Sequence, residues 1–283
     1  MKVGLVLEGG AFRTIYSCGV TDAFLDKNII ADYVIGASAG AGFGVSYASN
    51  QPGRNYEIVT RYGITRKYMG LGNFLNPKTK AYFNLDYVYS TIPNELVPFD
   101  YKAFQEFKGE FRAVVTNVET VKAEYLDVDR TYNHNTILKA TCALPILSPI
   151  IKYKGNGYLD GGIADSIPYE QAFRDGCDKV IIILTREYDY IKVAGRTMKH
   201  ALVHYRNFPE LCKAMETRPE RYNECIRRIK ELENEGKVFV FRPKSVGTFK
   251  RNERNIEKIR ELYNDGYTQG LERLEELKEY LAK

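Results

Sequence analysis

The stretch "YVIGASAGAGFG", residues 33–44, places a single serine, Ser38, among small residues directly after an apolar segment. The apolar segment predicts a buried strand, and the run of small residues that follows predicts a helix. Within the stretch, "GASAG" at residues 36–40 matches GxSxG, a turn that presents a nucleophilic serine between a strand and a helix. A glycine-rich turn of this kind also binds phosphates, with the serine as a helix cap, so the motif alone leaves both interpretations open.

The same strand-loop-helix pattern occurs once before, at the start of the chain. "KVGLVLE" (2–8) predicts a short buried strand, and "IYSCGVTDAFLDK" (15–27) predicts an amphipathic helix. Strands that alternate with helices indicate an α/β fold with parallel strands. Further strands are predicted at 111–118, 122–128, 178–186 and 235–243, and two charged helices that pack across the sheet at 221–236 and 255–283.

The composition indicates one compact, enzyme-sized unit that spans residues 1–283. The chain is 44% hydrophobic, which is enough for a substantial core, and it contains no internal repeat or low-complexity linker. Its net charge of +5 combines 41 basic with 36 acidic residues, which is typical of a mixed solvated surface and not of a basic tail that binds nucleic acid. We expect a motif-bearing core over about 1–185 and a C-terminal part with helices and the final strand over about 186–283.

Cysteine usage and hydropathy predict where the protein works. The five cysteines are odd in number and form no CxxC pair, which argues against a disulfide framework or a thiolate metal cluster and favours a reducing, cytoplasmic setting. The apolar run at the N-terminus meets Glu8 too early for a signal peptide, and no run reaches transmembrane length. We therefore expect a cytoplasmic protein that contacts membranes peripherally, if at all.

A serine nucleophile needs donors for the oxyanion that it creates. The segment "GGAFR", residues 9–13, follows the first strand, so its amide hydrogens would lie at the same sheet edge as Ser38, beside the amide of Ala39. The same segment also fits a plain strand-helix turn. If the donor interpretation is right, the oxyanion hole is formed by Gly9, Gly10, Ala11 and Ala39.

The serine also needs a base. The chain has three histidines, His134, His200 and His204, and the last two are spaced as in a HExxH zinc site. Ala201 stands where that site has its glutamate, so surface histidines are favoured and no metal is expected. Asp160, in "GYLDGGIADSIP", is the better candidate, although an Asp-Gly-Gly sequence is also typical of a hairpin turn.

Together these motifs resemble the patatin-like phospholipase family, whose pattern is a glycine-rich oxyanion loop ending in Arg, then GxSxG, then DGG or DGA. Here they are "GGAFR", "GASAG" and "DGG", in that order. "KATCALPILSP" is similar to the family's Ala-Ser-x-Ala-x-Pro segment, with Thr141 in place of the serine. The resemblance covers roughly residues 1–185. It implies a three-layer fold, with a mainly parallel central sheet flanked by helices.

The resemblance also implies a Ser–Asp dyad without histidine and without a cofactor. Ser38 would attack the ester, and Asp160 would take its proton and later activate water. An exposed carboxylate with a pKa of about 3.9 is a weak base, so Asp160 has to be desolvated. The supporting residues would be Arg13 beside the oxyanion loop or at a lipid phosphate, the elbow glycines Gly36 and Gly40, and Gly161 and Gly162 of the DGG motif.

Two residues depart from the family pattern. Ala11 stands where the third glycine of the oxyanion loop is usual, and Thr14 stands where a glycine commonly follows the arginine. If the loop needs a positive φ at position 11, alanine is strained there and oxyanion binding is weaker.

The sequence thus predicts a lipid acyl-ester hydrolase of the phospholipase, lysophospholipase or carboxylesterase type. The aromatic-rich segment 68–107 would suit an acyl-chain pocket, although core packing is the commoner fate of such residues. Two alternatives stay open: a Ser–His–Asp α/β-hydrolase that uses His200 or His204, and a patatin-like scaffold with weak catalysis that binds or regulates. A nucleotide-binding module is not supported, because the chain lacks GxGxxG and GxxxxGK[ST].

Overall fold

A computed structural model describes residues 1–76, 79, 81–130, 135–195 and 198–283. Its strands form one mixed sheet in the order β5-β6-β3-β2-β1-β7-β8, with β4 paired to β3. The strands are β1 (Val3–Leu7), β2 (Tyr33–Ala37), β3 (Glu110–Asn117), β4 (Ala123–Asp127), β5 (Ile151–Tyr153), β6 (Asn156–Asp160), β7 (Lys179–Ile183) and β8 (Val238–Phe241).

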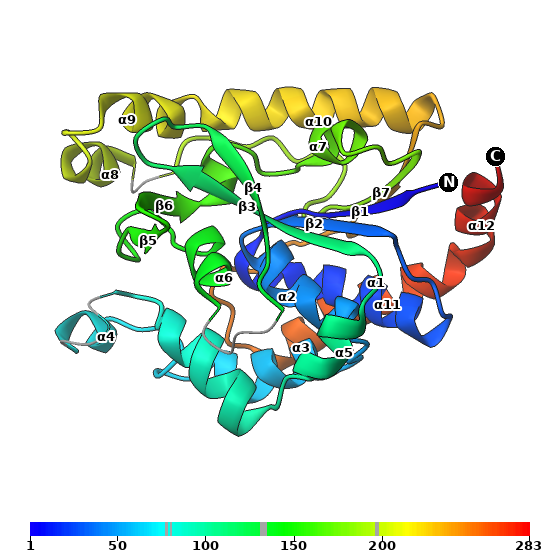
Figure 1. Cartoon of the computed structure of the whole chain (residues 1–283), viewed down its shortest axis with the longest axis horizontal. Coiled ribbons are helices and arrows are strands. Elements are labelled where there is room, and N and C mark those ends of the chain that lie inside the picture. The colour runs from blue at the N-terminus through cyan, green and yellow to red at the C-terminus, as the bar shows by residue number, and fades with distance from the viewer. Residues whose placement is uncertain (77–78, 80, 131–134, 196–197) are drawn as a thin grey trace.

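The helices cover both faces of this sheet (Figure 1). They are α1 (Ile15–Asp26), α2 (Ala39–Ala48), α3 (Arg54–Glu57), α4 (Gly72–Leu75), α5 (Tyr101–Glu106), α6 (Thr136–Thr141), α7 (Tyr169–Arg174), α8 (Met198–His204), α9 (Pro209–Glu216), α10 (Arg218–Asn234), α11 (Ile256–Glu272) and α12 (Leu274–Ala282). Single turns of 3-10 helix occur at Ala11–Thr14 and Gly161–Ile163, and π-helical segments at Ile58–Gly63 and Tyr87–Leu96.

The sheet is mainly parallel, as the sequence predicted. β3, β2, β1, β7 and β8 run parallel to one another, whereas β4, β5 and β6 are antiparallel to their neighbours. The predicted strands at 2–8, 111–118, 122–128, 178–186 and 235–243 correspond to β1, β3, β4, β7 and β8. These findings confirm an α/β fold in which helices flank a mainly parallel sheet.

Alternation along the buried strands separates the core into two layers. Leu5 and Leu7 of β1 point into the layer formed with α1, α2 and α11, whereas Val6 points into the layer formed with α7 and α10. The period of two that places neighbouring side chains on opposite faces produces this division. Three layers result, with α10 along the top of Figure 1 and α1, α2 and α11 below the sheet.

Two helical predictions were wrong in detail. Helix α1 is not amphipathic, because every residue from Ile15 to Leu25 is buried: α11 covers the side that the sheet leaves free. The charged stretch 255–283 forms two helices, not one. Helix α11 packs on α1, whereas α12 lies against β7 and β8 through Tyr280, whose hydroxyl accepts a hydrogen bond from the Val180 N–H over 3.0 Å. The break falls at Arg273, whose side chain donates a hydrogen bond to the Val240 carbonyl over 2.7 Å.

The aromatic-rich segment lies between β2 and β3 in the chain, outside the sheet, and forms the lower part of the molecule in Figure 1. Much of it is core: Tyr68, Met69, Tyr87 and Ile92 belong to the cluster that contains α1 and α2. Other side chains of this segment approach Ser38.

Candidate active site

Ser38 lies on a sharp turn between β2 and α2. Its backbone has φ 53° and ψ −129°, a conformation that residues other than glycine rarely adopt. The turn requires close contact between backbones, because a Cβ at Gly36 would lie 2.5 Å from the Ala41 nitrogen and one at Gly40 would lie 2.3 Å from the Leu7 carbonyl oxygen. Both glycines of GxSxG are therefore explained by packing, and Ser38 remains half-buried at the amino end of α2.

A threonine hydroxyl fixes this turn to the neighbouring strand. The Ser38 backbone N–H donates to Thr141 Oγ1 over 2.8 Å, and the Thr141 hydroxyl donates to the Val114 carbonyl of β3. Thr141 ends α6 and is fully buried. The residue that replaces the family's serine thus keeps a hydroxyl group at this position.

Asp160 ends β6, at the level of Ser38 in the sheet. Val114 of β3 pairs with Ala37 of β2, and Val115 pairs with Asp160, so one strand separates the serine turn from the aspartate. Two strand spacings place the backbones about 10 Å apart, which two facing side chains span. Asp160 does not lie in a hairpin turn. It is the last residue of β6, and the two glycines of "DGG" begin the 3-10 turn that follows.

Asp160 is buried, with 2% of the residue exposed. One oxygen, Oδ1, accepts a hydrogen bond from the Gly162 N–H over 2.8 Å, whereas Oδ2 has no hydrogen-bond partner within the described ranges. Burial raises the pKa of Asp160, and the Ser38 hydroxyl and the Arg218 guanidinium oppose this shift by favouring the charged form. The result is a buried carboxyl with one oxygen free to accept a proton.

The glycine-rich loop between β1 and α1 faces the same region. In the described part of the chain no hydrogen bond is donated by the backbone N–H groups of Gly9, Gly10, Ala11 and Ala39. Ala39 begins α2, whose amino end carries the positive side of the helix dipole. Ala11 has φ 49°, so the loop does require a positive φ at this position, where alanine is strained.

Two small cavities meet at Ser38 and Ala11. One, of about 50 Å³, is mostly apolar and is lined by residues that include Phe12, Phe43, Tyr68, Phe83, Leu85, Val88 and Tyr89. The other, also of about 50 Å³, is polar and contains Asp160 and several basic side chains. Three residues of the aromatic-rich segment, Tyr68, Phe83 and Tyr89, line the apolar cavity, and its use as an acyl-chain pocket stays a prediction.

The histidines do not approach this region. His200 and His204 lie exposed on α8, and neither lines the cavities that contain Ser38. His134 lies outside the described residues. Among the residues that the structure describes, no group of three or more His, Cys, Asp and Glu side chains is arranged to hold a metal ion.

Several residues at the site were not predicted from the sequence. Cys142 lines the apolar cavity, its sulfur lies 2.9 Å from the Tyr89 hydroxyl, and burial raises the pKa of its thiol to about 12. Glu8 lines the polar cavity together with Lys192, Arg186, Arg218 and Arg251. Glu8 could have been noticed, because it directly precedes the glycine pair, but the basic residues lie far from any motif.

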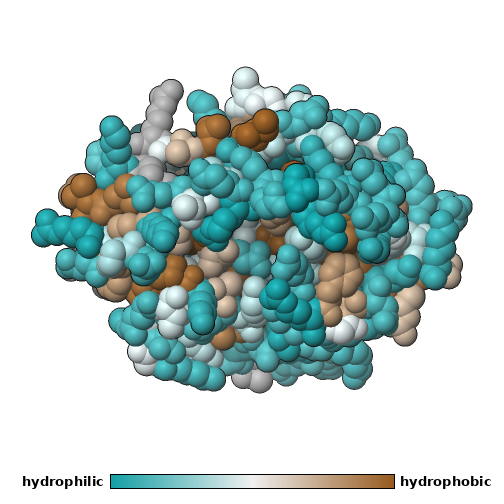
Figure 2. Space-filling view, turned by 90° about the horizontal axis from the view of Figure 1, so that it is seen from above, coloured by the Kyte–Doolittle hydropathy of each residue, from teal (hydrophilic) through white to brown (hydrophobic). Residues whose placement is uncertain are grey.

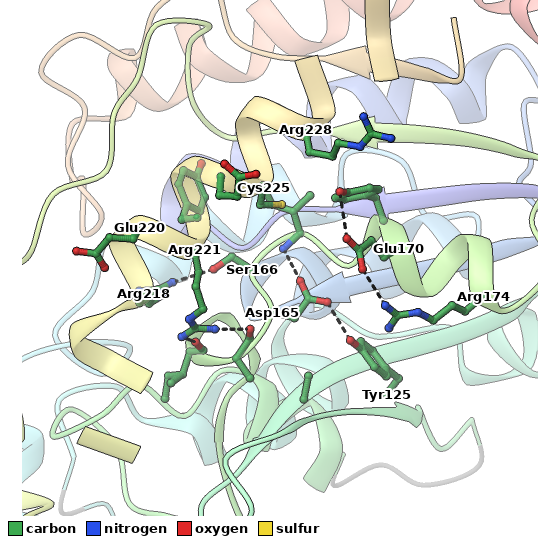
Figure 3. A pocket seen from close by; sticks show the side chains of 17 residues that line it. Tyr125, Asp165, Ser166, Glu170, Arg174, Arg218, Glu220, Arg221, Cys225 and Arg228 are labelled. Carbon is green, nitrogen blue, oxygen red and sulfur yellow. Dashed lines mark hydrogen bonds and ion pairs between the residues drawn. The ribbon is translucent and has the colours of Figure 1, made fainter. Parts of the chain in front are cut away.

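A wider hollow of about 590 Å³ has Arg218 and Ser166 among its lining residues (Figure 3). It is lined by basic and acidic side chains that partly satisfy one another: Glu170 pairs with Arg174 over 2.8 Å, and Asp165 accepts a hydrogen bond from Tyr125 over 3.0 Å. Neither Ser38 nor Asp160 lines it. Although this cavity is larger, it is therefore not the candidate site of ester cleavage.

Comparison with known proteins agrees with this geometry. The profile of the patatin-like phospholipase family matches residues 5–173, and that of a domain of unknown function, DUF6363, matches residues 208–282. The uncharacterized protein YjjU of Escherichia coli is 27% identical over 65% of this chain, and lysophospholipase nte1 of Aspergillus niger is 28% identical over 98% of it. The chain spans about half of YjjU (52%) and 18% of the fungal protein.

Among solved structures, VipD from Legionella pneumophila aligns with a TM-score of 0.49 and 14% identity, over 97% of this chain and 67% of that one. No helix in the described ranges combines the length and apolar character required to cross a bilayer. The family profile covers more than half of the chain and includes the glycine-rich loop at 9–13, the serine turn and the DGG motif. The resemblance inferred from the motifs is thus confirmed, and the chain belongs to the patatin-like phospholipase family.

Proposed function

We propose that the protein is a serine acyl-ester hydrolase acting on lipids, with Ser38 as nucleophile and Asp160 as base. The observation that carries this proposal is the pairing of a half-buried serine, on a strained strand-helix turn, with a buried carboxyl whose free oxygen lies in the same polar cavity. The raised pKa of Asp160 makes it a stronger base than an exposed carboxylate.

The reaction follows from these positions. Asp160 Oδ2 takes the proton of the Ser38 hydroxyl while Ser38 Oγ bonds to the ester carbonyl carbon. The N–H groups of Gly10, Ala11 and Ala39, with Gly9 beside them, donate to the resulting oxyanion. When the intermediate collapses, the C–O bond to the alcohol breaks and Asp160 returns the proton to that oxygen. Asp160 then takes a proton from water as the water oxygen bonds to the acyl carbon. The bond between that carbon and Ser38 Oγ breaks, Asp160 returns the proton to Ser38 Oγ, and the free acid leaves.

The lipid character of the substrate is supported by the family and by the apolar cavity. The fungal relatives are named lysophospholipases, and we extend that substrate class to this chain by similarity. A cavity of about 50 Å³ holds a few water molecules but no long acyl chain. Entry of a chain therefore requires side chains such as Tyr68, Phe83 or Tyr89 to move.

We also propose that the protein contacts membranes peripherally, from a cytoplasmic location. Large apolar side chains are exposed at the end of the molecule opposite the two termini, where α4 and α8 lie in Figure 1: Leu75 of α4 (87% exposed), Leu71 directly before that helix, and Val203 of α8. Figure 2 shows one face of this end, where hydrophobic residues gather beside the largely hydrophilic surface over α10. Insertion of such side chains into a lipid surface would present substrate to the site.

Hydrolysis of p-nitrophenyl esters over a series of acyl-chain lengths, combined with fluorophosphonate labelling, tests the proposal. Wild type should hydrolyse esters and be labelled, Ser38→Ala should lose both properties, and Asp160→Asn should lose at least about a hundredfold in rate. The exposed Ser245→Ala is the matched control and should retain both. Folding of each variant is checked by circular dichroism.

The other outcomes identify the alternatives. If Asp160→Asn keeps the wild-type rate and replacement of both His200 and His204 abolishes it, a Ser–His–Asp mechanism is correct. If folded wild type is neither labelled nor active on any ester, the chain is a patatin-like scaffold that binds or regulates, and the strained Ala11 accounts for the weak site.

A further inference from the structure

The polar cavity beside Ser38 is surrounded by basic groups. Five basic side chains line it: Arg13, Arg186, Lys192, Arg218 and Arg251. Only two carboxylates line the same cavity, Glu8 and Asp160. The local charge is therefore strongly positive, although the whole chain carries only +5.

The two carboxylates offset only part of this charge: Glu8 favours the charged forms of Arg13 and Lys192, and Asp160 that of Arg218. Glu8 accepts one hydrogen bond from the Thr185 N–H over 2.6 Å and another from the Tyr222 hydroxyl over 2.7 Å, so both of its oxygens serve neutral donors. Asp160 accepts from the Gly162 N–H. In the described ranges, no ion pair within 4 Å joins any of the five basic side chains to a carboxylate.

Arg13 is the clearest example of a buried basic side chain without a paired carboxylate. Its side chain is 7% exposed, and its Nε has no hydrogen-bond partner among the described residues. Burial, together with the positive charges of Arg186 and Arg251, lowers the pKa of Arg13 to about 10. An unpaired cation in such a place is costly unless an anion binds to it.

Aromatic rings and backbone groups hold three of the other cations in place. The Lys192 ammonium lies 3.8 Å from the centre of the Tyr222 ring, and the Arg186 guanidinium lies 4.1 Å from that of Tyr190. Arg218 donates from Nε to the Gly162 carbonyl. Burial and the neighbouring arginines lower the pKa of Lys192 to about 7 against the opposing effect of Glu8, so the positive charge around Lys192 is only partly compensated.

Most of these groups come from the C-terminal part of the chain. Arg186, Lys192, Arg218 and Arg251 all follow residue 173, where the patatin-like match ends. Asn223 of α10 fixes the backbone of Lys192 on both sides, by accepting from its N–H over 2.8 Å and donating to its carbonyl over 3.0 Å. The segment that matches DUF6363 thus supplies and orients charge at the site that contains Ser38.

We propose that these five residues form an anion subsite that binds a phosphate group on the alcohol side of the ester. This inference rests on the proposed hydrolase function for its substrate. The apolar cavity on the other side of Ser38 suits the acyl chain, which leaves the polar cavity for the alcohol part. Guanidinium groups bind phosphate oxygens in pairs, and an ammonium group adds a point charge.

The first test uses two substrates that differ only in the phosphate: 1-oleoylglycerol and 1-oleoylglycerol 3-phosphate, in the same detergent micelles. We expect kcat/KM of wild type to be at least about tenfold higher for the phosphate ester, as one phosphate–arginine contact suffices for that ratio. Lys192→Met and Arg251→Gln should each lower the ratio severalfold. Lys102→Gln removes an exposed charge on α5 and should leave the ratio unchanged.

The second test measures binding of inorganic phosphate to Ser38→Ala by titration calorimetry, which needs no catalysis. Binding that weakens in the Lys192→Met background, together with the substrate ratio, supports the subsite. If inorganic phosphate binds but kcat/KM is equal for the two esters, the cavity binds free phosphate. That result would overturn the proposal that it binds a phosphate group of the substrate.

Absence of phosphate binding and of the substrate preference would overturn the subsite while ester hydrolysis still supported the hydrolase. If neither ester is hydrolysed, the hydrolase proposal and the headgroup assignment fail together. The titration then decides whether the cavity is an anion site at all.

Discussion

The backbone N–H of Ser38 donates a hydrogen bond to the side-chain oxygen of Thr141 over 2.8 Å. Because the Thr141 hydroxyl also donates to the Val114 carbonyl, one side chain connects the serine turn with the central strand β3. The unusual backbone conformation of Ser38 is therefore stabilised by a residue 103 positions away in the chain.

Replacing Thr141 with valine removes this connection without a change in shape. Thr141→Val leaves the Ser38 N–H and the Val114 carbonyl without a partner in a buried place, which should cost about 1–3 kcal/mol in the free energy of unfolding. Ester hydrolysis should fall as well, because the turn that orients Ser38 is loosened. Urea unfolding and initial rates measure the two effects.

Thr141→Ser is the matched control, since it keeps the hydroxyl and loses only a methyl group. It should retain more than half of the activity, with a stability loss of about 1 kcal/mol. Equal stability and activity for the valine variant and wild type would show that the bond contributes nothing.

The raised pKa of Asp160 predicts how stability depends on pH. A carboxyl whose pKa is higher in the folded state than in the unfolded state stabilises the fold when protonated, and this contribution is lost as the pH rises through the folded-state pKa. Asp160→Asn keeps an acceptor for the Gly162 N–H but carries no charge. Relative to wild type, the asparagine variant should therefore become more stable as the pH rises from about 4 to 7.

Urea unfolding of both proteins across this pH range provides the measurement, followed by tyrosine fluorescence because the chain has 22 tyrosines and no tryptophan. Asp127→Asn, at the exposed end of β4, serves as the control for the loss of one carboxylate. A constant difference between Asp160→Asn and wild type would contradict the raised pKa.

Ala11 offers a prediction of increased stability. At φ 49° the alanine occupies the left-handed region, which costs about 1–2 kcal/mol for residues other than glycine. Glycine removes that cost but loses more entropy on folding, so Ala11→Gly should gain up to about 1 kcal/mol. Ala23→Gly in helix α1 has no such strain to relieve and removes a buried methyl group, so it should lose at least about 1 kcal/mol. Destabilisation of similar size in both variants would show that Ala11 is not strained.

The strands next to the motifs could be predicted because their signals are local. β1 and β2 are apolar runs that end at glycine-rich turns, and both were found from a few residues of sequence. Helix α1 was misread because a helix that is buried on all sides has no polar face, and the partner that buries it, α11, lies over 200 residues away. Periodicity describes one element and says nothing about what covers it.

The site residues, too, divide into those marked by local sequence patterns and those brought in by distant parts of the chain. Ser38 and the loop at 9–13 are marked by local glycine patterns, and Asp160 was singled out by resemblance to the family. Arg218, Lys192 and Arg251 belong to no motif, since they reach the cavity only through the packing of α10 and the loops around it. The charge of the cavity could therefore be seen only in three dimensions.

The contact between α1 and α11 tests the prediction that residues 1–283 fold as one unit. Gly266 of α11 lies so close to α1 that an added Cβ would be 2.0 Å from the Tyr16 carbonyl oxygen. Gly266→Ala must push the helices apart, which should cost about 1–3 kcal/mol although alanine favours the helix itself. If the chain is one unit, urea unfolding should remain a single transition whose midpoint falls. Gly72→Ala, where a Cβ meets open space, should unfold as wild type does. Two transitions, of which only one moves, would instead show that the C-terminal part unfolds separately from the core that contains Ser38.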